Sequence, residues 1–175
     1  LNYKTTFIGL QGSQNTILKS STPILGFKVR DNANFVLQGL TIDGPRINNN
    51  GNLDATDVNF KNSNARFSTI YSISNSVNPT VKLTNCVFTD TFASELAGAV
   101  NVYNGKVDII NCIFTNTKSS QFGGAIEVRN SNLNIVNSKF NYGESKHGGA
   151  VYAYNSDVIM TGSTFDNCKS HSSGA

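Results

Sequence analysis

The first chemistry that the sequence suggests is the binding of a hard cation by carboxylates. Asp54 and Asp57 are three residues apart on an irregular stretch, and Asp43 is nearby in the sequence. Carboxylate oxygens are the ligands that Ca²⁺ prefers. The competing interpretation, which we favour, is that all three are solvated loop acids. We therefore predict neither a metal ligand nor a catalytic residue in this stretch.

Two histidines suggest a second metal hypothesis. His147 precedes Gly148 in a predicted loop, and His171 occupies a similar place farther along the chain. Stacked imidazoles can bind Zn²⁺, but no third ligand accompanies this pair in the sequence. No Ser-His-Asp order and no nucleophile elbow is found. The sequence accordingly predicts no cofactor, no metal and no catalytic residue.

The elements that must position these residues follow from a repeat. Gly123–Phe140 (GGAIEVRNSNLNIVNSKF) recurs as Gly148–Phe165 (GGAVYAYNSDVIMTGSTF) and is preceded by Ala97–Phe114 (AGAVNVYNGKVDIINCIF). The period is 25–26 residues, and each copy holds two short alternating apolar runs. Such a period is typical of a solenoid, and no stretch carries a helical stripe of apolar residues. We predict an all-β chain that forms a right-handed parallel β-helix (β-solenoid) of about five to seven coils.

Alternation along each strand assigns side chains to an inner and an outer face. Inner positions of successive coils should stack into columns that form the core. The predicted inner columns are Val100/Ile126/Val151, Val102/Val128/Ala153, Val81/Val107/Leu133/Val158, Leu83/Ile109/Ile135/Met160 and Phe88/Phe114/Phe140/Phe165. Asn tolerates a left-handed backbone, and its amide can bond to the next coil. The predicted corner columns are therefore Asn85/Asn111/Asn137 and Asn104/Asn130/Asn155.

The first half of the chain repeats less regularly. Its β-type runs are Thr5–Gly9, Thr16–Leu18, Ile24–Val29, Phe35–Ile42, Leu53–Phe60 and Thr69–Ser74, with a polar loop at Asn48–Asn52. We predict one β-helix domain over residues 1–175, with irregular coils in 1–80 and regular coils in 81–175. The last residues begin a further copy without a visible cap, so we expect a fragment of a longer array.

Outward columns on one predicted sheet supply the candidate binding residues. Aromatic and guanidinium groups beside amides suit contacts with sugars or proteins. The alternative is a plain solvent-facing surface that uses Tyr because strands favour it. Asp108 lies between Lys82 and Asn134, so no column pairs two acids as a glycoside hydrolase requires. The candidate columns, both predicted to face solvent, are Tyr103/Arg129/Tyr154 and Asn101/Glu127/Tyr152.

The cysteines, the charge and the lengths of the apolar runs limit which classes of protein remain possible. Cys86 and Cys112 share a column and could form a disulfide or remain stacked thiols, while Cys168 has no Cys in its column. The net charge is +3 with Lys and Arg scattered, so no nucleic-acid partner is predicted. No apolar run approaches the ~20 residues of a membrane span. Without a signal peptide or an initiator Met, Leu1 is expected to begin a processed or excised chain.

The repeated motif resembles that of extracellular right-handed β-helix repeat proteins. These include chlamydial polymorphic outer membrane proteins and adhesin-like surface proteins of methanogenic archaea and some protists. Their GGA[I/L/V] motif is met at Gly123–Ile126 and Gly148–Val151, while Ala97–Val100 is a degenerate AGAV. Their FxxN motif is replaced here by F-x-N, as in Phe114-Thr115-Asn116. Thr6–Leu18 (TFIGLQGSQNTIL) is similar to an early coil of pectin-lyase-like proteins.

This resemblance implies an extracellular or cell-surface location and the following functional expectations. The first is a non-catalytic, adhesin-like protein or a fibre or stalk segment, whose flank binds glycans or surface proteins. The second is a polysaccharide lyase or hydrolase of the pectin-lyase-like group. The third is a structural filament subunit that associates end to end through unpaired strand edges. The absence of catalytic motifs from the sequence favours a non-enzymatic role.

Overall fold

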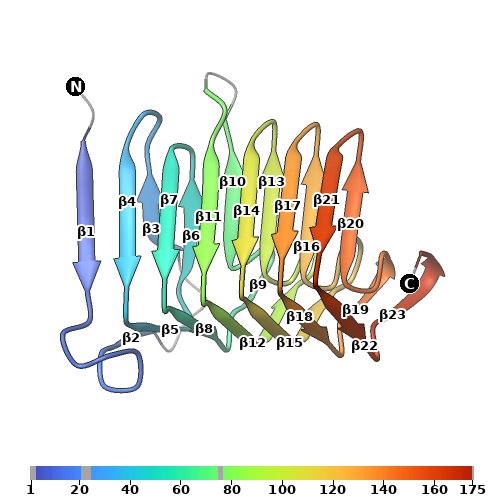
Figure 1. Cartoon of the computed structure of the whole chain (residues 1–175), viewed down its shortest axis with the longest axis horizontal. Coiled ribbons are helices and arrows are strands. Elements are labelled where there is room, and N and C mark those ends of the chain that lie inside the picture. Colours follow the sequence, from blue (N-terminus) through green and yellow to red (C-terminus); the bar gives the residue numbers. More distant parts are fainter. Residues whose placement is uncertain (1–2, 21–24, 75–76, 175) are drawn as a thin grey trace.

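Three parallel sheets wind around one core in about six turns, which confirms the predicted all-β parallel solenoid. The computed structural model describes residues 3–20, 25–74 and 77–174, and no helix occurs among them. Successive turns contribute one strand at a time to each of two sheets and one or two strands to the third sheet, so equivalent positions of successive coils meet in register (Figure 1).

We name the sheets by their places in Figure 1. The front sheet holds β1 (Lys4–Ile8), β4 (Asn34–Gln38), β7 (Asn52–Thr56), β11 (Thr80–Thr84), β14 (Lys106–Ile110), β17 (Asn132–Val136) and β21 (Asp157–Thr161). The back sheet holds β3 (Leu25–Val29), β6 (Arg46–Asn49), β10 (Ile70–Ile73), β13 (Val100–Tyr103), β16 (Ile126–Arg129) and β20 (Val151–Tyr154).

The base sheet runs along the bottom of Figure 1. It contains β2 (Ile17–Lys19), β5 (Thr41–Asp43), β8 (Asn59–Lys61), β12 (Val87–Ala93), β15 (Ile113–Ser119), β18 (Lys139–Asn141) and β22 (Thr164–Asp166). The short strands β9 (Asn64–Ala65), β19 (Glu144–His147) and β23 (Lys169–Ser173) extend it. Only two alternating apolar runs per copy were predicted from the sequence, whereas the Phe-bearing segments form this third sheet.

The phenylalanine column confirms the predicted inner face. Phe60, Phe88, Phe114, Phe140 and Phe165 stack with ring centroids 4.6–4.9 Å apart and planes within 2–11° of parallel. The rings of Phe60, Phe88, Phe114 and Phe140 are buried. Among the predicted inner residues, Ala153, Val158, Met160 and Phe165 are exposed, because they lie in the last strands of their sheets.

Left-handed residues turn the chain at the corners. The two predicted Asn columns adopt positive φ, and Asn111 Nδ2 donates to Asn85 Oδ1 at 3.3 Å. A third column was missed, although the F-x-N motif marks it. The Asn of that motif bends the chain within the base sheet, since Asn116 and its neighbour Asp90 lie inside β15 and β12. The third column consists of Asn62, Asp90, Asn116, Tyr142 and Asn167, with φ between 52° and 57°.

The same corners split two runs that sequence analysis predicted to be continuous. Leu53–Phe60 breaks at Asp57, whose φ is 56°, and Phe35–Ile42 breaks after Gly39, whose φ is 62°. The predicted polar loop at Asn48–Asn52 is also wrong, because its first residues belong to β6 and its last begins β7. Asn49 points into the core, where its Nδ2 lies 3.1 Å from each of three acceptors, including Ser72 Oγ.

A search of the described residues finds no helix long and apolar enough to cross a membrane.

Candidate binding surface

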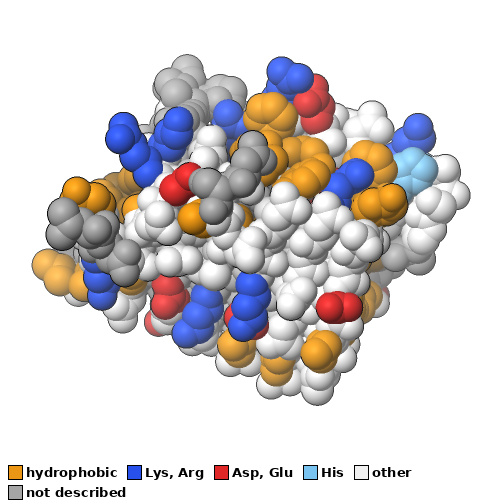
Figure 2. Space-filling model, turned by 90° about the horizontal axis from the view of Figure 1, so that it is seen from above, with side chains coloured by type: hydrophobic (Ala, Val, Ile, Leu, Met, Phe, Trp, Pro, Cys, Tyr) orange, Lys and Arg blue, Asp and Glu red, His pale blue; other side chains and the backbone are white. Residues whose placement is uncertain are grey.

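The back sheet brings the six predicted binding residues together on its outer face. Parallel register aligns Asn101, Glu127 and Tyr152 in one column and Tyr103, Arg129 and Tyr154 in the next. These columns belong to β13, β16 and β20, which are adjacent strands. In Figure 2, hydrophobic and basic side chains gather along the upper part of the view, which is the side of the back sheet.

Arg129 is the centre of this surface. Its Cζ lies 5.7 Å from the ring centroid of Tyr103, 5.4 Å from Tyr152 and 5.8 Å from Tyr154. A fourth ring, that of Phe122, is closest at 4.6 Å. A guanidinium within about 6 Å of a ring face is attracted by the ring quadrupole. We call these five residues together with Glu127 the Arg129 cluster.

The predicted exposure of Asn101 and Glu127 is wrong, because both side chains are fully buried. The segment that enters β16 folds over the outer face of the sheet. Gly123 has a φ of 56°, and a Cβ on it would lie 2.0 Å from the Ile126 carbonyl oxygen, so only glycine fits this close approach. The turn places Phe122 against Tyr152, with ring centroids 4.7 Å apart.

Burial and Arg129 shift the pKa of Glu127 in opposite directions. Arg129 Nε donates to Glu127 Oε1 at 2.7 Å. Burial raises the pKa of Glu127, and this effect outweighs the lowering by Arg129, by the Asn101 side chain and by the Ala97 backbone. Glu127 Oε2 and both amide atoms of Asn101 are buried without a hydrogen-bond partner of good geometry among the described residues. The Arg129 cluster therefore contains a buried carboxylate with one oxygen that is not hydrogen-bonded.

A second aromatic group continues the surface toward the N-terminal coils. Arg46 and Arg66 place their Cζ atoms 5.2 and 5.0 Å from the Phe67 ring centroid. Phe67 stacks on Tyr71 with centroids 5.2 Å apart and planes at 17°. Arg66 Nε also bonds Glu95 Oε1 at 2.7 Å. Sequence reasoning missed this group, although Tyr71 is in register with Asn101 and extends its column.

The acidic residues considered for a cation do not converge. Asp43 is buried and lies 3.7 Å from both Lys19 Nζ and Lys61 Nζ. Asp57 turns a corner and accepts a hydrogen bond from Asn85. Asp54 lies on β7 in register with Lys82. No group of three or more His, Cys, Asp or Glu that could hold a metal is found in the described part of the chain.

The two histidines have separate partners. His147 Nδ1 lies 2.8 Å from Ser173 Oγ, and its ring stacks on Phe122 at 5.4 Å between centroids. His171 Nε2 lies 2.8 Å from Glu144 Oε1. The stacked imidazole pair of the metal hypothesis does not form.

Cys86 and Cys112 are adjacent, buried and unbonded. The Cys86 backbone N–H donates to Cys112 Sγ at 3.4 Å, and the Cys112 N–H donates to Ser138 Oγ at 3.0 Å. The sulfur of Cys112, and after it burial, raises the pKa of Cys86. This column of thiols and hydroxyls serves to satisfy backbone donors at a corner.

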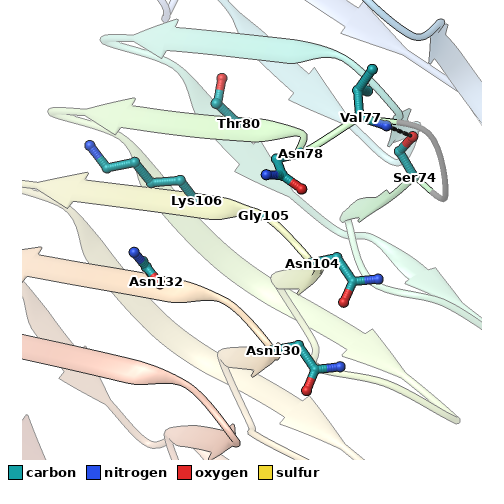
Figure 3. A pocket seen from close by; sticks show the side chains of 9 residues that line it. All are labelled: Ser74, Val77, Asn78, Thr80, Asn104, Gly105, Lys106, Asn130 and Asn132. Atoms are coloured by element: carbon teal, nitrogen blue, oxygen red, sulfur yellow. Dashed lines mark hydrogen bonds between the residues drawn. The ribbon is translucent and has the colours of Figure 1, made fainter.

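A polar pocket of about 560 Å³ lies where the back sheet turns into the front sheet (Figure 3). Asn104 and Asn130 contribute to its wall from successive corners, together with Asn78 and Lys106. Asn130 Oδ1 accepts a hydrogen bond from Asn155 Nδ2 at 2.8 Å. These amides are therefore part of the corner ladder, and the pocket gives no separate indication of a ligand.

The class that this fold defines is the parallel β-solenoid. A comparison with protein-family models, curated proteins and solved structures finds no match.

Proposed function

We propose that the chain is part of a non-catalytic, adhesin-like protein of the cell surface or extracellular space, whose back sheet binds a partner protein. The Arg129 cluster carries this proposal. Tyr and Arg dominate the binding energy of protein interfaces, and here one Arg and three Tyr are fixed on adjacent strands of a rigid sheet. Tyr154 is 58% exposed at the edge of the cluster.

Preorganisation supports a protein rather than a glycan as the partner of this surface. The rings of Tyr103, Tyr152 and Tyr154 already face Arg129, so they offer less free ring face for stacking on a sugar. Because these three side chains are already ordered, they lose little further conformational entropy when a partner docks. A flat surface with a fixed Arg and peripheral Tyr side chains is suited to the centre of a protein interface.

The localisation and the absence of catalysis rest on the sequence resemblance and on the dispersal of the acids. Asp43 and Asp57 have structural partners. The experiment must also address two alternatives. One is a lyase or hydrolase of the pectin-lyase-like group, and the other is a structural subunit that assembles end to end into a filament.

The test is binding of the folded chain to immobilised fibronectin, laminin and mucin, each before and after enzymatic deglycosylation. We expect saturable binding that survives deglycosylation and weakens about tenfold in Tyr154→Ala, which corresponds to ~1.4 kcal/mol. Tyr3→Ala is the matched control, because Tyr3 is 70% exposed and precedes β1, at the end of the solenoid opposite to β20, which holds Tyr154.

Other outcomes would redirect the assignment. Binding that disappears on deglycosylation would assign the surface to a glycan. Release of unsaturated ends from polysaccharides with Ca²⁺, abolished by Asp54→Ala, would replace the non-catalytic role with an enzymatic one. Filaments without binding would favour a structural subunit.

A further inference from the structure

Tyr142 occupies a corner position that the rest of its column fills with Asn or Asp. Asn62, Asp90, Asn116 and Asn167 turn the chain there with φ between 52° and 55°, and Tyr142 has a φ of 57°. Asn and Asp tolerate this region, whereas a bulky aromatic residue in it is a genuine outlier. Tyr142 is therefore held in a backbone conformation that Asn or Asp, the residues at the other positions of the column, would adopt more readily.

The substitution also interrupts the polar ladder of the corner. Within the column, Asn116 Nδ2 donates to Asp90 Oδ1 at 2.5 Å. Asn62 Nδ2 donates to Asp43 Oδ1 at 2.8 Å, although Asp43 lies outside the column, in register with Lys61. Tyr142 has no carboxamide to continue this pattern toward Asn167. The residue therefore opposes the local backbone preference and the ladder, and an unfavourable local choice of this kind points to a functional site.

The ring of Tyr142 is free to meet a ligand. Its side chain is 56% exposed. No ring contact, cation–π contact or side-chain hydrogen bond to it occurs among the residues that the structure describes, in contrast to the rings of the Arg129 cluster. Tyr142 lines an open pocket of about 370 Å³ at the bend of the base sheet between β18 and β19.

The pocket surrounds the ring with hydrogen-bonding groups of both kinds. Asn116 and Asn167 precede and follow Tyr142 in the column and line the pocket with it. Lys118 Nζ pairs with Glu144 Oε2 at 3.1 Å, and Glu144 Oε1 lies 2.8 Å from His171. Lys169 completes the wall. Ammonium and amide groups donate, while the carboxylate and amide oxygens accept.

We propose that this pocket, which we call the Tyr142 site, binds a pyranose ring of a neutral glycan. The C–H groups of a sugar ring can cover a free aromatic face, and sugar hydroxyls both donate and accept hydrogen bonds, as the wall requires. Of the two ammonium groups in the wall, that of Lys118 is already paired with the Glu144 carboxylate, so the pocket lacks the cluster of free cations that favours a phosphate or sulfate group. The Tyr142 site lies on the base sheet and shares no lining residue with the Arg129 cluster. The proposal for the Tyr142 site does not depend on the function proposed for the Arg129 cluster.

The test replaces Tyr142 by the residue type of its own column. Tyr142→Asn removes the ring, relieves the backbone strain and restores the ladder, so the variant should fold and its melting temperature should rise. The probes are cellotetraose, mannotetraose and N-acetylchitotetraose, followed by saturation-transfer NMR and calorimetry. We expect the native chain to bind at least one of them and Tyr142→Asn to weaken that binding about tenfold or more.

Tyr142→Phe is the matched control, because it retains the ring and should retain most of the affinity. Tyr154→Ala should bind the same oligosaccharide unchanged, which separates the Tyr142 site from the Arg129 cluster. The proposal is overturned if the native chain binds none of the three probes at millimolar concentrations. It is equally overturned if a folded Tyr142→Asn variant binds as well as the native chain.

Discussion

Arg129 and Glu127 form an ion pair in which one partner is far more buried than the other. Nε and Oε1 are 2.7 Å apart, while the side-chain exposures are 23% for Arg129 and 0% for Glu127. Arg129 can therefore keep part of its hydration, whereas Glu127 has lost all of it. Since a buried charge is costly unless fully paired, the carboxylate is the unfavourable member of the Arg129 cluster.

The first prediction concerns the pH dependence of stability. Burial raises the pKa of Glu127 in the folded chain. At pH values between the ordinary Glu pKa of ~4.3 and this raised pKa, the folded chain therefore still binds a proton that the unfolded chain has released. The contribution of Glu127 to the unfolding free energy should therefore fall as the pH rises from that value through the raised pKa, and level off above it. Urea midpoints of native chain and Glu127→Gln, measured from pH 4 to 8, isolate this contribution.

As the pH rises, the free energy of unfolding of the native chain should decrease relative to that of Glu127→Gln. Glu144→Gln provides a contrasting control, since His171 and then Lys118 lower the pKa of Glu144. Its contribution should instead be constant above the ordinary pKa of ~4.3 and be lost only as the pH falls from there through the lowered pKa. A difference for Glu127 that is flat, or that rises with pH, would contradict the argument.

The second prediction concerns the phenylalanine column. Phe114 is fully buried between Phe88 and Phe140, so Phe114→Ala should lower the free energy of unfolding by ~3–5 kcal/mol. Phe165→Ala is the matched control, because Phe165 belongs to the same column but is 45% exposed, and its loss should cost clearly less. Chemical denaturation measures both. Equal losses would contradict the assignment of Phe114 to a more buried position than Phe165.

The fold could be predicted from the sequence because each coil repeats the same choices. Apolar residues at alternate positions fix the inner face, and a repeated Phe fixes the register, so one period defines the next. The corners were harder to locate where the ladder residue is not Asn. Asp57 and Gly39 interrupt runs that alternate correctly on both sides, and alternation alone does not reveal a left-handed residue.

The candidate surface could be predicted only in part. Register places Tyr103 beside Arg129 as expected, but the outer face of a strand does not have to face solvent. Phe122 and the Gly123 turn cover Glu127, and this covering depends on the path of a connection that follows no periodic pattern. The free ring of Tyr142 was missed for a different reason: its corner column, although periodic, was not recognised.

The third prediction concerns the cysteines. Cys86 and Cys112 are buried free thiols, whereas Cys168 is partly exposed, although burial also raises its pKa. A thiol reagent should modify Cys168 in the native chain and reach the other two only after unfolding, because burial keeps the reagent away from the sulfur atoms of Cys86 and Cys112. Mass spectrometry of the alkylated peptides identifies each site. Rapid modification of Cys112 in the native chain would show that its coil opens readily.

The last prediction separates backbone strain from hydrogen bonding at the corners. Asn111 has a φ of 54° and donates to Asn85 Oδ1, while Gly39 and Gly162 take the equivalent conformation in other coils with φ of 62° and 61°. Asn111→Ala should lose the ladder bond and add ~1–2 kcal/mol of left-handed strain, whereas Asn111→Gly should lose the bond without that strain. The alanine variant should therefore unfold at a lower urea concentration than the glycine variant. If the two variants were equally stable, the preference of this column for Asn would have to come from the ladder bond, not from the backbone conformation that Asn tolerates.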